Sequence, residues 1–186
     1  MKIFKNEWSN IILIVIILAL LIPQTRKPLQ IFANKVFAFS PEVTDEAKRE
    51  QLSGYQWTLE NNSGKSIDFS EYQDEVIVVN YWATWCPPCI AEMPSFQNLY
   101  EDYNNKVKFF FISGEEHETV RNFLKEKRFS LPTYRMLSPD PKPLEGYTLP
   151  TTYVIDRQGN IVIKKVGSAD WNSQAMRNTL DKLLKS

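Results

Sequence analysis

The feature that most constrains the fold is a Cys-x-x-Cys sequence placed between a strand-like and a helix-like stretch. Residues 76–82 (VIVVNYW) form an apolar run of strand length, and residues 91–103 carry apolar side chains at helical spacing. Cys86 and Cys89 lie between these two stretches. The order predicts a buried strand that leads through the cysteine pair into a helix, with Cys86 near the helix N-terminus.

A helix N-terminus favours the anionic form of a nearby thiol. The helix dipole and the free backbone N–H groups stabilise negative charge there. Lowering a thiol pKa from about 8.5 to about 7 makes roughly half of the thiol nucleophilic at neutral pH. Cys89, one helical turn on, is placed to attack a mixed disulfide formed by Cys86, and Pro87 and Pro88 suit the first helical turn. The pattern favours a redox-active pair over a structural pair or half of a metal site.

Composition narrows the remaining classes of protein. The 186 residues are 43% hydrophobic and 24% charged, which is typical of a globular chain. The chain has two cysteines and one histidine, His117, so a disulfide-stapled fold and a four-cysteine zinc site are excluded, and we predict no metal. Residues 41–186 hold 17 basic and 21 acidic residues, and this mildly acidic balance predicts no nucleic-acid partner. We expect His117 on the solvated surface. Three tryptophans are expected in the core: Trp57, Trp82 and Trp171.

The N-terminal region contains the longest apolar stretch. Twelve unbroken apolar residues run from Ile11 to Ile22 and end at Pro23. Extended back to Trp8, a helix here would be roughly 22 Å long, against about 30 Å for a bilayer core. No small-x-small cleavage site follows Ile22 directly, so we expect an uncleaved anchor, with a cleaved signal peptide or a buried helix as alternatives. Basic residues nearly balance across this stretch and leave its orientation open: Lys2, Lys5, Arg26, Lys27 and Lys35.

The rest of the chain alternates strand-like and helix-like stretches. Residues 40–53 are polar and indicate a linker, and the folded part is expected to begin near Tyr55. The expected strands are 55–60, 76–82, 107–113, 151–155 and 161–166, and the expected helices are 91–103, 115–128 and 171–184. This order predicts an α/β sheet with parallel central strands. The predicted organisation is an anchor at 1–25, a juxtamembrane linker at 26–50 and a domain at 51–186.

Two motifs carry a resemblance to a known family. Residues 85–94 (WCPPCIAEMP) and 149–161 (LPTTYVIDRQGNI) resemble the thioredoxin superfamily, and most of all the membrane-anchored TlpA/ResA-like thiol–disulfide oxidoreductases of bacterial envelopes. The resemblance covers residues 51–186. It implies a thioredoxin-like fold, with a central mixed β-sheet flanked by helices, and an N-terminal transmembrane anchor.

The resemblance also implies roles for individual residues. Cys86 would be the attacking thiol and Cys89 the resolving thiol. Because Cys86 lies nearer the helix N-terminus, we expect Cys86, and not Cys89, to be exposed. Trp85 would pack at the site. Pro150 would be the cis-proline beside the cysteines, so we expect a cis Leu149–Pro150 bond.

The chain departs from the family pattern at three places. Asn80 stands where ordinary thioredoxins carry a buried aspartate. Glu92, by contrast, matches the acidic position of the subfamily. We expect a partly buried acid with a raised pKa that shuttles a proton for Cys89 or tunes the thiolate, in place of the acid missing at Asn80, with a surface carboxylate as the alternative. Residues 138–146 are unusually rich in proline, and Leu149 is bulkier than the usual residue before the proline.

The function implied by the resemblance is thiol–disulfide exchange through the WCPPC sequence. The Cys86–Cys89 disulfide itself would serve as the redox centre, without a bound cofactor. The implied protein is a reductant of envelope disulfides, including those met in cytochrome c maturation. It would be anchored in the inner membrane with its domain in the periplasm and would draw on a membrane electron donor. The alternatives are a non-catalytic binding module and a peroxiredoxin, whose Pro-x-x-x-Thr-x-x-Cys pattern fails at Val79 and Ala83.

Overall fold

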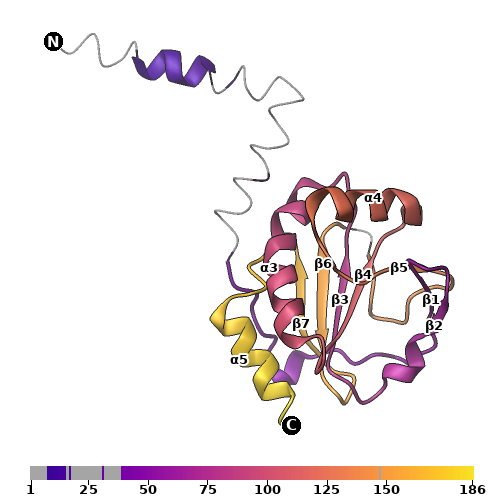
Figure 1. The fold of residues 1–186 in the computed structure, drawn as a ribbon. Helices are drawn as coiled ribbons and strands as arrows, with labels where there is room; N and C mark the ends of the chain where they lie inside the picture. Colours follow the sequence, from indigo (N-terminus) through magenta and orange to yellow (C-terminus); the bar gives the residue numbers. More distant parts are fainter. Residues whose placement is uncertain (1–7, 16, 18–30, 32–38, 147) are drawn as a thin grey trace.

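The computed structural model describes residues 8–15, 17, 31, 39–146 and 148–186. In these residues the main elements follow one another as Figure 1 shows. They are β1 (Thr58–Asn61), β2 (Ser66–Asp68), β3 (Ile77–Tyr81), α3 (Pro87–Tyr103), β4 (Lys108–Ile112), α4 (His117–Lys127), β5 (Thr133–Met136), β6 (Thr151–Ile155), β7 (Ile161–Val166) and α5 (Gln174–Leu183). Two short 3₁₀ turns lie at Glu46–Lys48 and Phe69–Tyr72.

The strands form one mixed sheet in the order β2-β1-β5-β4-β3-β6-β7. The pairs β3–β4 and β4–β5 are parallel, whereas β6 runs antiparallel to both β3 and β7. The predicted thioredoxin-like mixed sheet is therefore confirmed. The central strand β3 is buried along its whole length because side chains cover both of its faces.

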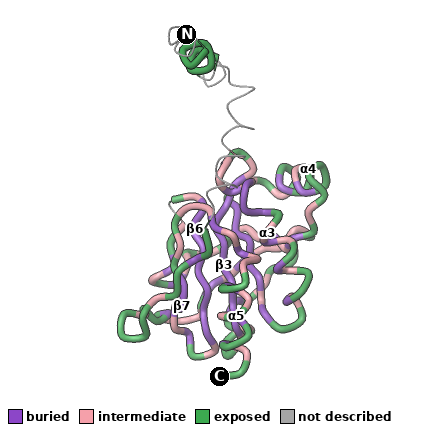
Figure 2. The backbone as a smooth tube through the Cα atoms, turned by 90° about the vertical axis from the view of Figure 1, so that its left-hand side faces the viewer, coloured by how far each residue is buried: buried purple, intermediate pink, exposed green. Residues whose placement is uncertain are grey.

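Each face of the sheet carries its own apolar cluster. Alternate residues of β3 point to opposite sides, so Val78 lies in one cluster and Ile77 and Val79 lie in the other. Side chains from α3, α4 and α5 complete the first cluster. The second cluster is covered by Phe69 of a 3₁₀ turn and by Leu144 of the proline-rich segment. Figure 2 shows the buried backbone running through the strands.

Several element boundaries differ from the expected ones for local reasons. The last helix begins at Gln174 rather than Trp171, because the Ser173 hydroxyl accepts a hydrogen bond from the Met176 N–H at 3.3 Å and caps the helix there. The short strand β2 was not expected, because it has only three residues, of which Ile67 alone is apolar and none is fully buried. Its place is set by antiparallel pairing with β1.

The segment before Tyr55 is attached to the sheet. The Thr44 N–H donates to the Val162 carbonyl at 2.8 Å, and the Ile161 N–H donates to the Glu50 carbonyl at 2.8 Å. Backbone contacts with the sheet thus begin upstream of Tyr55, where the sequence placed the start of the folded part.

The predicted anchor at 1–25 lies largely outside the described residues. Residues 8–15 and 17 are helical, and their side chains are exposed. Among the described residues, no helix combines the length and the apolar character required to cross a bilayer.

Candidate active site

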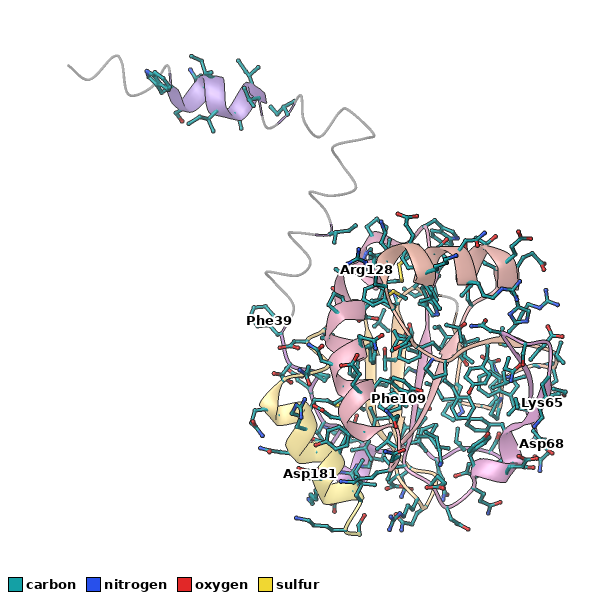
Figure 3. All side chains as sticks on the ribbon, viewed as in Figure 1. Phe39, Lys65, Asp68, Phe109, Arg128 and Asp181 are labelled. Carbon is teal, nitrogen blue, oxygen red and sulfur yellow. A yellow bond between two sulfur atoms is a disulfide. The ribbon has the colours of Figure 1, made fainter. Side chains whose placement is uncertain are left out.

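Strand β3 and helix α3 bring the two cysteines to the helix N-terminus. Cys86 is the N-cap of α3, and its Sγ accepts a hydrogen bond from the Cys89 N–H at 3.3 Å. Pro87 and Pro88 fill the first two helical positions, as expected, so the helix begins four residues before the predicted Ala91. The cysteines form a disulfide with an S–S distance of 2.05 Å, drawn in yellow in Figure 3.

The expectation of an exposed Cys86 is wrong for this oxidised state. Cys86 is 3% exposed and Cys89 is 1% exposed, and both belong to the apolar cluster beneath the helices. The reason is the capping geometry, which holds the Cys86 Sγ against the first turn of α3 and bonds it to Cys89. Trp85, expected to pack at the site, is instead 63% exposed.

The second motif supplies the loop before β6. The Leu149–Pro150 peptide bond is cis, which confirms that prediction. Pro150 is buried, and its carbonyl accepts a hydrogen bond from the Gly167 N–H at 2.9 Å. Leu149 packs against both apolar clusters and therefore lies where the two faces of the sheet meet the cysteine-bearing loop.

Glu92 is a buried acid with three hydrogen-bond donors around it. It is 2% exposed, one turn beyond Cys89 on α3. The Asn80 side-chain amide donates to one of its carboxyl oxygens at 3.0 Å. The Trp171 indole N–H donates to the other oxygen at 2.8 Å, and the Ala169 backbone N–H donates to the same oxygen at 3.3 Å.

These surroundings change the acidity of Glu92. Burial raises its pKa to about 8, although the hydrogen bonds from Trp171, Asn80 and Ala169 oppose the rise. Glu92 is thus buried even more completely than the partly buried acid that we expected, and its pKa is raised as predicted. The alternative of a surface carboxylate is wrong. Asn80, also buried, donates to Thr152 Oγ1 at 2.8 Å and so ties this acid to β6.

A second carboxylate holds the loop before the cysteines. Glu115 accepts hydrogen bonds from the Thr84 N–H at 2.7 Å and from the Thr84 hydroxyl at 2.6 Å. The sequence did not single out this contact, because Glu115 lies 31 residues away in an acidic run that looked like a solvated helix end. The contact fixes the backbone two residues before Cys86.

A groove of about 560 Å³ lies beside Trp85. Its walls come from the loop that bears the cysteines, from the β4–α4 connection, from β5 and from the proline-rich segment. The lining includes Tyr81, Trp85, Glu115, Met136, Asp140 and Leu149. The proline-rich segment, residues 138–146, thus forms part of the rim of the groove.

Two further expectations concern residues away from the cysteines. Trp57, Trp82 and Trp171 are all buried, as predicted, and Trp171 has the additional contact with Glu92. His117 is not a solvated surface residue, because its Nε2 lies 2.8 Å from a Glu60 carboxyl oxygen and its side chain is 17% exposed. The folding of β1 against α4 brings these two residues together. In the described part of the chain, no group of three or more His, Cys, Asp or Glu side chains could hold a metal ion.

Solved structures support the fold. A DsbF homologue from Corynebacterium diphtheriae gives a TM-score of 0.58 at 20% identity and covers 77% of this chain and 93% of its own. A secreted Mycobacterium tuberculosis disulfide oxidoreductase homologous to E. coli DsbE gives a TM-score of 0.55 at 19% identity, over 69% of this chain and 97% of that structure.

Two curated proteins found by sequence are more similar to this chain than these solved structures are. The thiol-disulfide oxidoreductase ResA of Bacillus subtilis (strain 168) is 31% identical over 134 residues, covering 69% of this chain and 71% of ResA. The thioredoxin-like protein YneN of the same strain is 30% identical over 135 residues, covering 67% of this chain and 75% of YneN. The model of the AhpC/TSA family matches residues 53–164. The resemblance inferred from the two motifs is confirmed, and since the family model spans more than half of the sequence, the chain belongs to the AhpC/TSA family.

Proposed function

We propose that this ResA-like thiol–disulfide oxidoreductase works as a reductant of protein disulfides in the bacterial envelope. The observation that carries the proposal is the Cys86–Cys89 pair at the N-terminus of α3, one turn from the buried acid Glu92. The pair supplies the two electrons, and the acid supplies a site for the proton. The similarity to ResA supports the same reaction class.

The proposed reaction balances as two exchanges of sulfur partners. In the reduced enzyme the Cys86 thiolate attacks one sulfur of a substrate disulfide, whose S–S bond breaks and releases one substrate thiolate. Cys89 then loses its proton and attacks the Cys86 Sγ, which forms the enzyme disulfide and releases the second substrate thiolate. Two electrons pass to the substrate, and both of its thiolates take up protons. A dithiol donor in the membrane reduces the enzyme again.

Glu92 is the proton acceptor for Cys89 in this proposal. A general base is most effective when its pKa lies near the working pH, and with a pKa of about 8 roughly one tenth of Glu92 is ionised at pH 7. This ionised fraction accepts the Cys89 proton. Asn80 and Trp171 keep the carboxyl group oriented through their hydrogen bonds. The remaining site residues shape the start of α3 and the surface around the Cys86–Cys89 pair. They are Trp85, Pro87, Pro88, Leu149 and Pro150.

The proposed location is the outer side of the inner membrane. Residues 1–25 would form an uncleaved anchor, residues 26–50 the juxtamembrane linker, and residues 51–186 the periplasmic domain. The apolar run from Ile11 to Ile22 supports the anchor. Substrates in this compartment include oxidised apocytochromes, whose thiols must be reduced before haem is attached.

The test uses the full-length protein in detergent with dithiothreitol as the electron source. We expect the wild-type protein to accelerate insulin reduction and Cys86→Ser and Cys89→Ser to lose that activity. Failure of the wild-type protein would favour a binding module, and consumption of hydrogen peroxide would favour a peroxidase. Equilibration with glutathione measures the direction: a potential near about −270 mV supports a reductant, and one near about −120 mV contradicts it.

A further inference from the structure

We infer that Tyr81 is a positioning residue that fixes one wall of the groove beside Trp85, so that the groove selects polypeptide disulfides with a basic side chain near the target cysteine. This inference rests on the proposed function and names the substrate class of the same site. It concerns residues that thiol–disulfide chemistry does not itself require.

Tyr81 holds the proline-rich segment in two ways. Its hydroxyl donates to an Asp140 carboxyl oxygen at 2.8 Å, and burial and the Asp140 charge raise the pKa of Tyr81, so the hydroxyl keeps its proton. The Gly146 backbone lies so close to the ring that a Cβ added there would be 2.1 Å from the Tyr81 Cδ1. Tyr81 therefore sets the position of both Asp140 and Gly146, which line the groove.

Other contacts hold the proline-rich segment, residues 138–146, against the rest of the domain. Leu144 is fully buried in the second apolar cluster. The Ser53 N–H donates to the Lys142 carbonyl at 2.8 Å, and the Tyr153 hydroxyl donates to the Glu145 carbonyl at 3.2 Å. The segment is thus built into the domain, and Asp140 is presented at a defined point of the groove.

The charges along the groove indicate the ligand. Asp140 and Glu115 supply two carboxylates, and no lysine or arginine is among the described residues that line it. Trp85 is 63% exposed and Met136 is 42% exposed, so the groove also offers apolar contact area. A basic side chain would complement the carboxylates and neighbouring apolar side chains would cover Trp85 and Met136, whereas an acidic side chain would be repelled.

The experiment compares two peptide substrates with one small disulfide. Each peptide carries a single cysteine as a mixed disulfide with 2-mercaptoethanol and a leucine beside it, followed by lysine in one peptide and glutamate in the other. Bis(2-hydroxyethyl) disulfide is the reference that does not need the groove. The proteins are full-length wild type, Tyr81→Phe, Asp140→Asn and Tyr103→Phe, held in detergent with dithiothreitol as the electron donor, and the rate without enzyme is subtracted.

Tyr103→Phe is the matched control. Tyr103 is buried like Tyr81 and donates to the Asp181 carboxylate at 2.9 Å, but it joins α3 to α5 and is not part of the groove. It therefore loses the same kind of hydrogen bond elsewhere. Chemical denaturation of all four proteins reports how much stability each change removes.

We expect the wild-type protein to prefer the lysine peptide by about 10-fold in kcat/KM, which corresponds to about 1.4 kcal/mol. Asp140→Asn should reduce this preference to about 3-fold or less. Tyr81→Phe should raise KM for the lysine peptide by about 5-fold with little change in kcat. Tyr103→Phe should keep the wild-type preference and KM.

Three results would overturn the inference. They are a wild-type protein without preference, a Tyr81→Phe protein with unchanged KM, and a Tyr103→Phe protein that changes as much as Tyr81→Phe. In each of these cases the reaction with bis(2-hydroxyethyl) disulfide still supports the proposed function. A wild-type protein inert toward that small disulfide would instead overturn the proposed function, and this inference with it.

Discussion

At the residue scale, Glu92 shows how burial and hydrogen bonding compete within one side chain. The three donors around it stabilise the carboxylate, yet burial outweighs them and raises its pKa to about 8. At neutral pH the folded protein therefore holds a proton on Glu92 that an unfolded chain would release. The same acid that serves catalysis in our proposal makes stability depend on pH.

We predict that Glu92→Gln flattens the dependence of stability on pH. Because the folded-state pKa of about 8 lies above the ordinary value of 4.5, the contribution is complete below about pH 4.5 and is lost as pH rises through about 8. The loss in the wild-type protein is on the order of 4 kcal/mol. Urea unfolding of the oxidised proteins at pH 5, 7 and 9 measures it, with the exposed Glu101→Gln as the control on the same helix. Parallel profiles for wild type and Glu92→Gln would contradict the prediction.

A second residue-scale prediction separates the two cysteines. We expect Cys89→Ser to accumulate mixed disulfides with envelope proteins, because Cys86 caps α3 and attacks first while the resolving thiol is missing. Cys86→Ser should accumulate few. Non-reducing gels followed by mass spectrometry of the trapped partners measure the difference, and equal trapping by both variants would show that the assignment of roles is wrong.

At the element scale, the sequence predicted the strands and helices that have a local pattern. It missed hydrogen bonds between residues that lie far apart in the sequence. Strands 151–155 and 161–166 match the structure because each is a short run rich in β-branched residues, and a turn-forming segment, residues 156–160 (DRQGN), joins them. Pro87 and Pro88 were correctly placed in the first turn of α3, although the apolar spacing typical of a helix begins only at Ala91. The contact between Glu115 and Thr84 and that between Tyr81 and Asp140 were missed, since polar pairs 31 and 59 residues apart leave no local pattern.

We predict that Gly146→Ala destabilises the protein, whereas Gly114→Ala does not. An added Cβ at Gly146 would overlap the Tyr81 ring, which is buried and cannot move aside freely. Overpacking of this kind costs about 1–3 kcal/mol. Gly114 lines the same groove but has no neighbouring atom within 4 Å of an added Cβ. Thermal and urea unfolding compare the two variants, and equal stability of both would refute the close packing at Gly146.

At the scale of the whole molecule, the domain is joined to the proposed anchor by a segment that is partly built into it. Besides the contacts of Thr44 and Glu50, the Asp170 N–H donates to the Phe39 carbonyl at 3.1 Å. The described segment that begins at Phe39 therefore passes beside the residues that lead into α5, and Figure 1 shows this course. Among the described residues, the stretch from Phe39 to Glu50 is therefore held against the domain by backbone hydrogen bonds.

We predict that the protein remains in the membrane fraction at full length. The apolar run from Ile11 to Ile22 has no small-x-small site directly after it, so signal peptidase would have no substrate there. Carbonate washing of membranes, followed by mass determination of the retained protein, measures this. A soluble mature chain that begins near Phe39 would refute the anchor.

The hydrogen bond from Trp171 to Glu92 gives the molecule a built-in optical reporter. The indole that donates to the carboxyl group is fully buried, so its fluorescence is sensitive to whether that group carries a charge. Trp85 is exposed to water and next to Cys86, so its emission responds to a different event, the opening of the disulfide. A protein in which phenylalanine replaces Trp8, Trp57, Trp82 and Trp85 would keep Trp171 as its one tryptophan. Its emission would follow the proton on Glu92 with a midpoint of about 8. Comparison with a protein that keeps only Trp85 would time proton transfer and electron transfer separately without an added label.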